Sequence, residues 1–168
     1  ETVWRQADKY KVPRVCFINK LDRTGANFDA SLESIKTKLG ANTLCLQLPI
    51  GLEDRFEGVV DLISQKAFVW KDKLKAQTRS YEIVDIPAPL LEDALIAREM
   101  LIEELAGFDD DLMEIFIEDP NKIKEEDIMA ACRRVTISGK AVPVFCGSSL
   151  KNKGVEPLLD AVVRYLPD

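Results

Sequence analysis

Short apolar segments followed by polar loops occur near both ends of the sequence. Residues 14 to 18 and residues 141 to 146 are brief apolar runs, and each is followed by a polar loop. Runs of this length bounded by turn residues are typical of strands buried on both faces of a parallel sheet. Helical spacing follows each loop, over residues 28 to 39 and over residues 155 to 166. The pattern therefore predicts a strand–loop–helix unit at each end of the chain.

The middle of the chain has a different pattern. Alternating and β-branched segments, separated by turn residues, are followed by helical periodicity punctuated by Pro and Gly. We expect strands over 43 to 49, 58 to 63, 66 to 70 and 81 to 86, then helices over 88 to 106, 109 to 118 and 124 to 138; a further helix is expected over 2 to 11. Strands followed by helices indicate an inserted α+β unit.

These elements predict an α/β fold that is divided into three parts. Residues 1–40 and 136–168 form the two parts of one α/β domain, and residues 41–135 form the inserted α+β subdomain. Ligands of open α/β sheets bind beyond the carboxyl ends of the strands. The polar loops after residues 18 and 146 are therefore expected to face a single ligand.

Composition and cysteine spacing argue against several kinds of site and segment. The formal net charge is −6, which argues against binding DNA or other nucleic acid through the overall field of this chain. The four cysteines form no C-x-x-C pair and there is no histidine, so a zinc site is not expected. No apolar run reaches membrane-spanning length.

The chain opens on a helical pattern without an initiator Met, so we expect a fragment of a longer protein.

The loop after residue 18 carries the sequence Asn19-Lys20-Leu21-Asp22. A carboxylate can accept two parallel N–H bonds, and guanine offers such a pair at its ring N1 and exocyclic N2, whereas adenine does not. Asp22 is therefore a candidate reader of guanine. Asn19 can anchor the loop and reach the other polar edge of the base, and the alkyl stem of Lys20 can lie across its face.

The loop after residue 146 can complete the pocket. A backbone N–H among Ser148, Ser149 and Leu150 can donate to the guanine O6, which needs a donor when buried. Leu150 can cover the base, and Ser148 can brace the first loop. A structural alternative is that Asn19 and Asp22 only cap the loop and the helix that follows it.

These residues also carry a resemblance to a known family. Asn-Lys-x-Asp is the guanine-specificity motif of GTPases, and the second loop resembles their Gly-Ser-Ala-x-Lys-Asn-Lys-Gly segment, with Ser149 in place of Ala. Further segments, over 2 to 10, 47 to 51, 58 to 62 and 151 to 162, look like the elongation factor G family of translational GTPases. The resemblance implies a partial P-loop NTPase-type sheet with the inserted subdomain of that family.

The resemblance implies that the intact protein is a ribosome-dependent GTPase that drives translocation during protein synthesis. Residues 133 to 136 look more like mitochondrial members, so a mitochondrial ribosome-releasing GTPase is an alternative, and the mitochondrial matrix is expected rather than the bacterial cytoplasm. An alternative of another class is a protein-interaction module without catalysis. Helices 88 to 118 of the insert are the expected contact with ribosomal stalk proteins, and rRNA contacts are expected from domains outside this chain.

The phosphate half of a GTPase site is not found in this sequence. It contains no Gly-x-x-x-x-Gly-Lys-[Ser/Thr] loop and no histidine, the residue that the family uses in catalysis. The expected ligand is GTP or GDP, held here through the base alone, with Mg²⁺ held through an upstream half-domain. We therefore expect no catalytic residue within the chain and no GTP hydrolysis by the chain alone.

Overall fold

The computed structural model describes residues 1–70 and 81–168, and it contains two sheets. The parallel sheet has the order β1-β7-β2, formed by β1 (Cys16–Ile18), β7 (Val142–Cys146) and β2 (Thr43–Cys45). Every residue of the central strand β7 is buried, as its continuous apolar sequence predicts. Phe17 lies opposite Phe145 in the β1–β7 register, so the two strands end at the same edge of the sheet.

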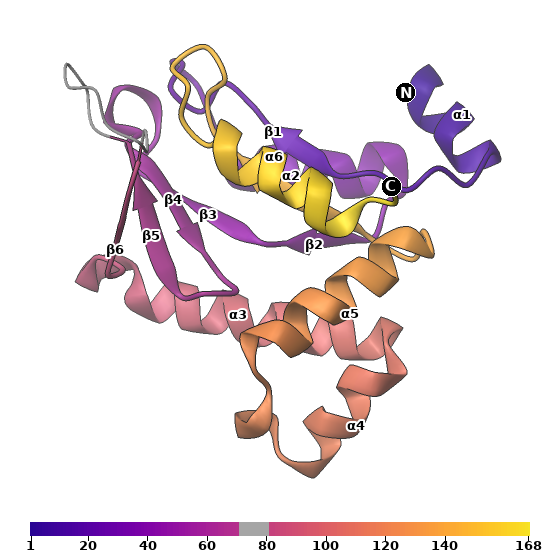
Figure 1. Cartoon of the computed structure of the whole chain (residues 1–168). Helices are drawn as coiled ribbons and strands as arrows, with labels where there is room; N and C mark the ends of the chain where they lie inside the picture. Colours follow the sequence, from indigo (N-terminus) through magenta and orange to yellow (C-terminus); the bar gives the residue numbers. More distant parts are fainter. Residues whose placement is uncertain (71–80) are drawn as a thin grey trace.

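The second sheet is antiparallel, with the order β3-β4-β5-β6. Its strands are β3 (Gln47–Ile50), β4 (Gly58–Asp61), β5 (Lys66–Val69) and β6 (Glu82–Val84). The single strand predicted over residues 43 to 49 was wrong, because the chain leaves one sheet and enters the other at Leu46 (Figure 1). The Leu46 N–H donates to the Val144 carbonyl (3.3 Å), and the Leu46 carbonyl accepts from the Leu62 N–H (3.0 Å).

Six α-helices and two 3-10 turns are found among the described residues. They are α1 (Thr2–Lys9), α2 (Phe28–Leu39), η1 (Glu53–Arg55), α3 (Ala88–Phe108), α4 (Asp110–Glu118), η2 (Pro120–Lys122), α5 (Glu125–Ile137) and α6 (Val155–Tyr165). The predicted helices are all present, with ends that differ by at most two residues. A parallel sheet together with a separate antiparallel sheet and helices confirms the predicted α/β class with its α+β part.

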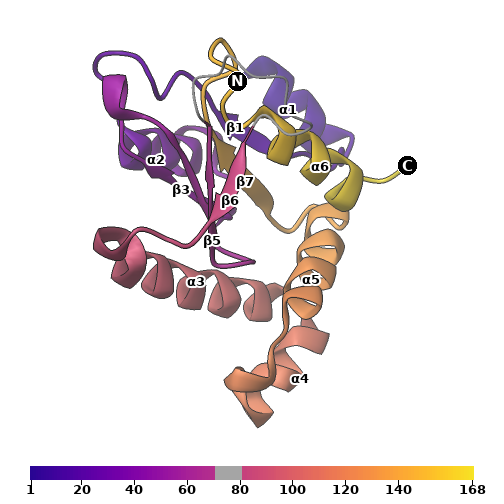
Figure 2. The same cartoon turned by 60° about the vertical axis from the view of Figure 1, so that its left-hand side comes forward.

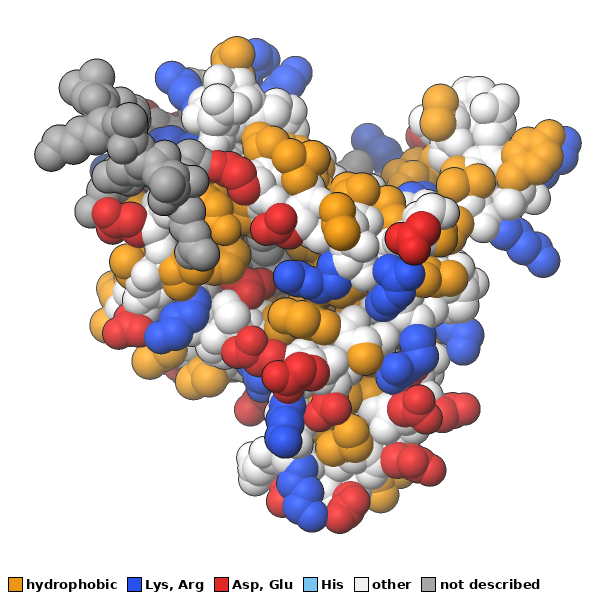
Figure 3. Space-filling view, viewed as in Figure 1, with side chains coloured by type: hydrophobic (Ala, Val, Ile, Leu, Met, Phe, Trp, Pro, Cys, Tyr) orange, Lys and Arg blue, Asp and Glu red, His pale blue; other side chains and the backbone are white. Residues whose placement is uncertain are grey.

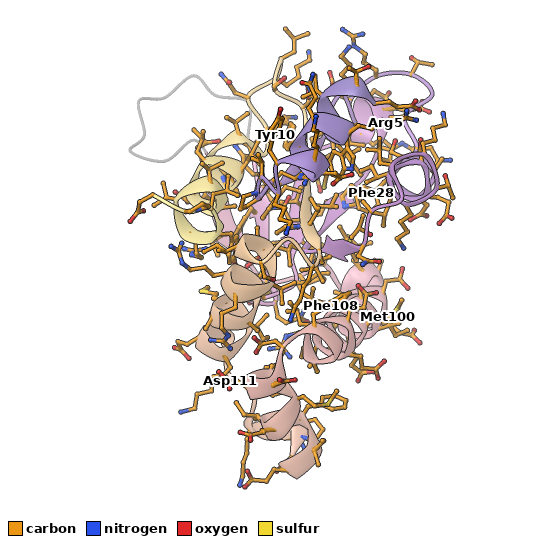
Figure 4. The ribbon with its side chains drawn as sticks, turned by 90° about the vertical axis from the view of Figure 1, so that its right-hand side faces the viewer. Arg5, Tyr10, Phe28, Met100, Phe108 and Asp111 are labelled. Atoms are coloured by element: carbon orange, nitrogen blue, oxygen red, sulfur yellow. The ribbon has the colours of Figure 1, made fainter. Side chains whose placement is uncertain are left out.

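The helices are placed unevenly around the sheets. The helix α3 runs along one side of the molecule and packs on β2 and α5, whereas α4 projects at the far end, away from the parallel sheet (Figures 1 and 2). The helix α1 has no buried residue and projects from the body (Figure 1), and Arg5 marks it in Figure 4. No helix within the described residues is long and apolar enough to cross a membrane.

The acidic residue Asp109 at the start of α4 has a structural role. Asp109 caps α4 by accepting from the Leu112 N–H (3.0 Å), and its two oxygens also accept from Nε and Nη2 of Arg134 on α5 (2.7 and 2.8 Å). The Arg134 guanidinium lowers the pKa of the Asp109 carboxyl. The pair therefore joins the two helices, and negative charge in the first turn complements the helix dipole.

The buried hydrophobic residues form two cores. The larger packs β2, β4, α3, α5 and α6 together. The smaller joins the parallel sheet to the antiparallel one, and its buried members are Ile18, Leu21, Phe28, Phe56, Val59, Trp70, Val144 and Cys146. Leu21 belongs to the polar loop after β1, so this core reaches directly beneath the candidate site. Trp70 is buried here as a packing residue.

Candidate functional site

The two polar loops singled out in the sequence lie side by side at one edge of the parallel sheet (Figure 1). The Gly147 N–H donates to the Ile18 carbonyl (3.0 Å), and the Leu21 N–H donates to the Gly147 carbonyl (3.2 Å). These bonds continue the β1–β7 pairing beyond the strand ends. The expectation that both loops face one place is met, because neighbouring parallel strands present their carboxyl ends together.

Side chains at the loop tips are joined as well. Asn19 Nδ2 donates to Ser149 Oγ (2.9 Å), and the Ser149 N–H donates to Asn19 Oδ1 (2.9 Å). The same Oδ1 accepts from the Lys20 N–H (2.8 Å). Asn19 therefore anchors the loops to one another. The Ser149 hydroxyl, at the position where the resembled motif has Ala, is accommodated and forms one of these bonds.

The first loop presents Asp22 above a buried anchor. Lys20 adopts a left-handed backbone conformation (φ 63°), which turns the chain so that Leu21 enters the smaller core and Asp22 remains at the surface. The helix α2 is capped by Asn27, whose Oδ1 accepts from the Ala30 N–H (3.0 Å). Asn19 and Asp22 are thus not the caps of that helix, which removes part of the structural alternative.

The second loop is a tight turn held at both ends. Ser148 and Lys153 exchange backbone bonds (2.8 and 2.9 Å), and the Asn152 N–H donates to the Ser149 carbonyl (3.1 Å). Leu150 lies at the tip with its side chain 78% exposed. An apolar side chain held this far into solvent at a rigid turn is suited to cover a flat ligand.

The electrostatics of the site centre on Asp22. The Ser148 hydroxyl beside it is the largest influence and lowers the pKa of the Asp22 carboxyl, with smaller contributions from the charges of Lys151 and Arg23. Ser148 is buried, and its Oγ makes no hydrogen bond of regular geometry to the described residues. The Ser148 hydroxyl therefore acts on the Asp22 carboxylate as a nearby polar group.

The contacts of Glu53 with the first loop, and of Lys153 in the second loop with Phe56, were not identified from the sequence. Glu53 donates its N–H to the Leu21 carbonyl (2.8 Å), and its Oε1 accepts from the Gly25 N–H (3.3 Å). Lys153 Nζ donates to the Phe56 carbonyl (3.1 Å). Nothing in the local pattern signals these contacts, because they join segments that are far apart along the chain.

Comparison with known proteins is consistent with this geometry. The family model of the elongation factor Tu GTP-binding domain matches residues 1–168. Elongation factor G from Karelsulcia muelleri (strain GWSS) and from Amoebophilus asiaticus (strain 5a2) are each 53% identical over 167 residues, 99% of this chain. The chain covers 24% and 23% of these two relatives, so it spans about a quarter of their length.

A solved protein structure has a fold similar to that of this chain. A crystal structure of a protein from Thermus thermophilus matches 98% of this chain with a TM-score of 0.82 and 25% sequence identity, and the match covers 24% of that protein. Sequence and fold therefore agree over essentially the whole chain. The chain belongs to the elongation factor Tu GTP-binding domain family, and over nearly its whole length it is similar to a segment of elongation factor G.

Proposed function

We propose that this chain is the base-reading part of the GTP-binding domain of a translational GTPase. The observation that carries the proposal is the direct bonding of the two loops through Asn19 and Ser149, which supports a shared pocket for Asp22 and Leu150. The family of the chain supports GTP or GDP as the ligand. Asp22 accepts from the guanine N1 and N2 groups, and its lowered pKa keeps the carboxylate in the acceptor form.

Among Ser148, Ser149 and Leu150, one backbone N–H is left to donate to the base oxygen. The Ser148 N–H already donates to the Lys153 carbonyl, and the Ser149 N–H donates to Asn19 Oδ1. The Leu150 N–H is the remaining donor of the three, and we propose that it meets the guanine O6. Asn19 Nδ2 keeps one hydrogen for a ring acceptor after bonding Ser149, and the Lys20 stem lies along the base.

A nucleoside titration tests this assignment. Guanosine is expected to shift the backbone amide signals of the two loops, those of residues 19–25 and 148–151, with a dissociation constant on the order of 1 mM, because the base contacts act without phosphate contacts. Adenosine at the same concentration is expected to leave these signals in place, since it lacks the paired donors. Equal shifts by both nucleosides, or guanosine shifts located elsewhere on the chain, would exclude a guanine-reading site here.

Acid is expected to abolish guanosine binding through Asp22. The carboxylate accepts only when ionised, and its pKa lies below the ordinary value of 3.8, so affinity is present above that pH and is lost as pH falls through the lowered pKa. The measurement is the guanosine dissociation constant from about pH 7 down to pH 3, with folding followed by circular dichroism. An affinity that falls several-fold between pH 7 and pH 5 while the chain stays folded would assign the titration to another group.

We propose that the whole protein binds Mg²⁺ and the phosphates through residues outside this sequence, since the chain has no Gly-x-x-x-x-Gly-Lys-[Ser/Thr] loop. Ribosome-dependent GTP hydrolysis, in translocation or in ribosome release, is the corresponding proposal for the whole protein. We also propose that the protein acts in the mitochondrion. For the chain itself, we propose that an inserted subdomain begins after residue 40 and ends at residue 135.

The insert is the proposed contact with ribosomal stalk proteins. Exposed apolar side chains lie along α3, and Met100 marks one of them in Figure 4; they are Leu91, Leu95, Ile96 and Met100. Acidic side chains gather over the helical end of the molecule (Figure 3), where α4 and α5 each begin with three acidic residues including the cap of α4. Exposed apolar and acidic side chains on these helices suit a partner that carries apolar and basic side chains.

A further inference from the structure

We propose that Glu53 is a positioning residue for the guanine-reading loop and that it acts from the inserted antiparallel sheet. This inference rests on the proposed function, because it concerns how well Asp22 is aimed at the base. It adds a residue outside both loop motifs. The main observation concerns the turn of residues 51–57, between β3 and β4. This turn is hydrogen-bonded to both loops of the candidate site.

Glu53 holds the first loop at two points. Its N–H donates to the Leu21 carbonyl (2.8 Å), and its carboxylate accepts from the Gly25 N–H (3.3 Å). Asp22 lies between these two points, directly after Leu21. Because both flanking backbone groups are tied to one residue, the peptide that carries the Asp22 side chain has little freedom to turn.

The same turn also contacts the second loop. The Phe56 carbonyl accepts from Lys153 Nζ (3.1 Å), and the Phe56 ring is buried in the core that contains Leu21. At the far end of β5, Trp70 Nε1 donates to Glu156 Oε1 in the first turn of α6 (3.3 Å). The inserted sheet is thereby attached to the segments on both sides of the proposed base pocket.

The backbone of the turn is fixed in an unusual conformation. Glu53 has φ 58°, in the left-handed region that a non-glycine residue seldom adopts. Gly51 has φ 74°, and a Cβ there would lie 2.2 Å from the Arg55 carbonyl oxygen. Since a residue in this region costs free energy, the conformation persists because its contacts hold it. Those contacts include the Phe56 N–H, which donates to the Glu53 carbonyl within the turn (3.2 Å), and the two bonds of Glu53 to the first loop, which support a positioning role.

Three variants separate positioning from general stability. Glu53→Ala removes the bond to Gly25, and Glu53→Gln keeps an acceptor oxygen at the same place. Asp54→Ala is the matched control, because Asp54 is exposed in the same 3-10 turn and makes no hydrogen bond or ion pair with the described residues. Each variant is titrated with guanosine and with inosine, which lacks the 2-amino group, and its melting temperature is recorded.

The expected result is a loss of both affinity and discrimination in one variant only. Glu53→Ala should bind guanosine about threefold to tenfold more weakly, the range for one hydrogen bond, and its preference for guanosine over inosine should fall by a similar factor. Exchange of the Gly25 amide hydrogen should become faster. Glu53→Gln and Asp54→Ala should keep the affinity and the preference of the unchanged chain.

The outcomes separate this inference from the proposed function. If the unchanged chain prefers guanosine and Glu53→Ala keeps the same guanosine affinity and guanosine-to-inosine ratio, the positioning role is wrong and the proposed function stands. A lower melting temperature with an unchanged ratio also overturns the role, since it shows a structural effect alone. If the unchanged chain does not distinguish guanosine from adenosine, the proposed function itself fails.

Discussion

Replacing Asp22 with asparagine is expected to weaken guanosine binding by about 10²-fold, since the charge of the acceptor is lost and one of its two hydrogen bonds is replaced by two facing donors. The amide group presents one donor and one acceptor in place of two acceptors. One of its atoms then faces the guanine 2-amino group with the wrong polarity. Xanthine has a carbonyl at that position, so xanthosine is expected to become the better ligand of the Asp22→Asn chain.

The control for this exchange is Asp29→Asn, the same chemical change at an exposed position in the first turn of α2. It should leave the guanosine-to-xanthosine preference unaltered. Both dissociation constants are measured by titration of loop amide signals for each chain. A preference that stays on guanosine in Asp22→Asn would show that another group reads the N1 and N2 edge.

Replacing Gly147 with alanine is expected to destabilise the fold by about 3 kcal/mol, the upper range for overpacking. A Cβ at Gly147 would lie 2.2 Å from the Lys153 carbonyl oxygen and 3.0 Å from Phe17 Cζ. The first of these atoms belongs to the backbone of the turn, so relief requires movement of the whole second loop. Guanosine binding should be lost together with the stability.

The matched control is Gly107→Ala, where an added Cβ meets nothing within 4 Å. Gly107 lies in the last turn of α3, so alanine should be neutral or stabilising by up to about 1 kcal/mol through helix propensity. The measurement is thermal unfolding, in which Gly147→Ala should melt about 6–12 °C lower than the unchanged chain. Equal melting temperatures for the two variants would mean that the close approach at Gly147 is relieved without cost.

Local patterns in the sequence were enough to place most elements. The continuous apolar runs before residue 18 and before residue 146 gave strands β1 and β7, and Gly40 ends α2 in the left-handed conformation expected of a helix-terminating glycine. The two candidate loops were predicted to meet because parallel strands share an edge. That part of the site depends on topology, which the strand–loop–helix order specifies.

Other features depend on contacts that no local pattern encodes. The segment around Leu46 is a continuous β-type sequence, and only its hydrogen bonds to Val144 and Leu62 show that it changes sheets. Glu53 has no sequence signal for its positive φ, which follows from long-range bonds to the first loop. The choice of Leu150 as the free backbone donor likewise required the observed bonds of Ser148 and Ser149.

The most direct test is a crystal structure of this chain with bound guanosine nucleotide. Both Asp22 carboxylate oxygens should lie about 2.7–3.1 Å from guanine N1 and N2, with the base between the Lys20 stem and Leu150. A base bound elsewhere, or bound between the loops with N1 and N2 turned away from Asp22, would contradict the reading of guanine by this carboxylate.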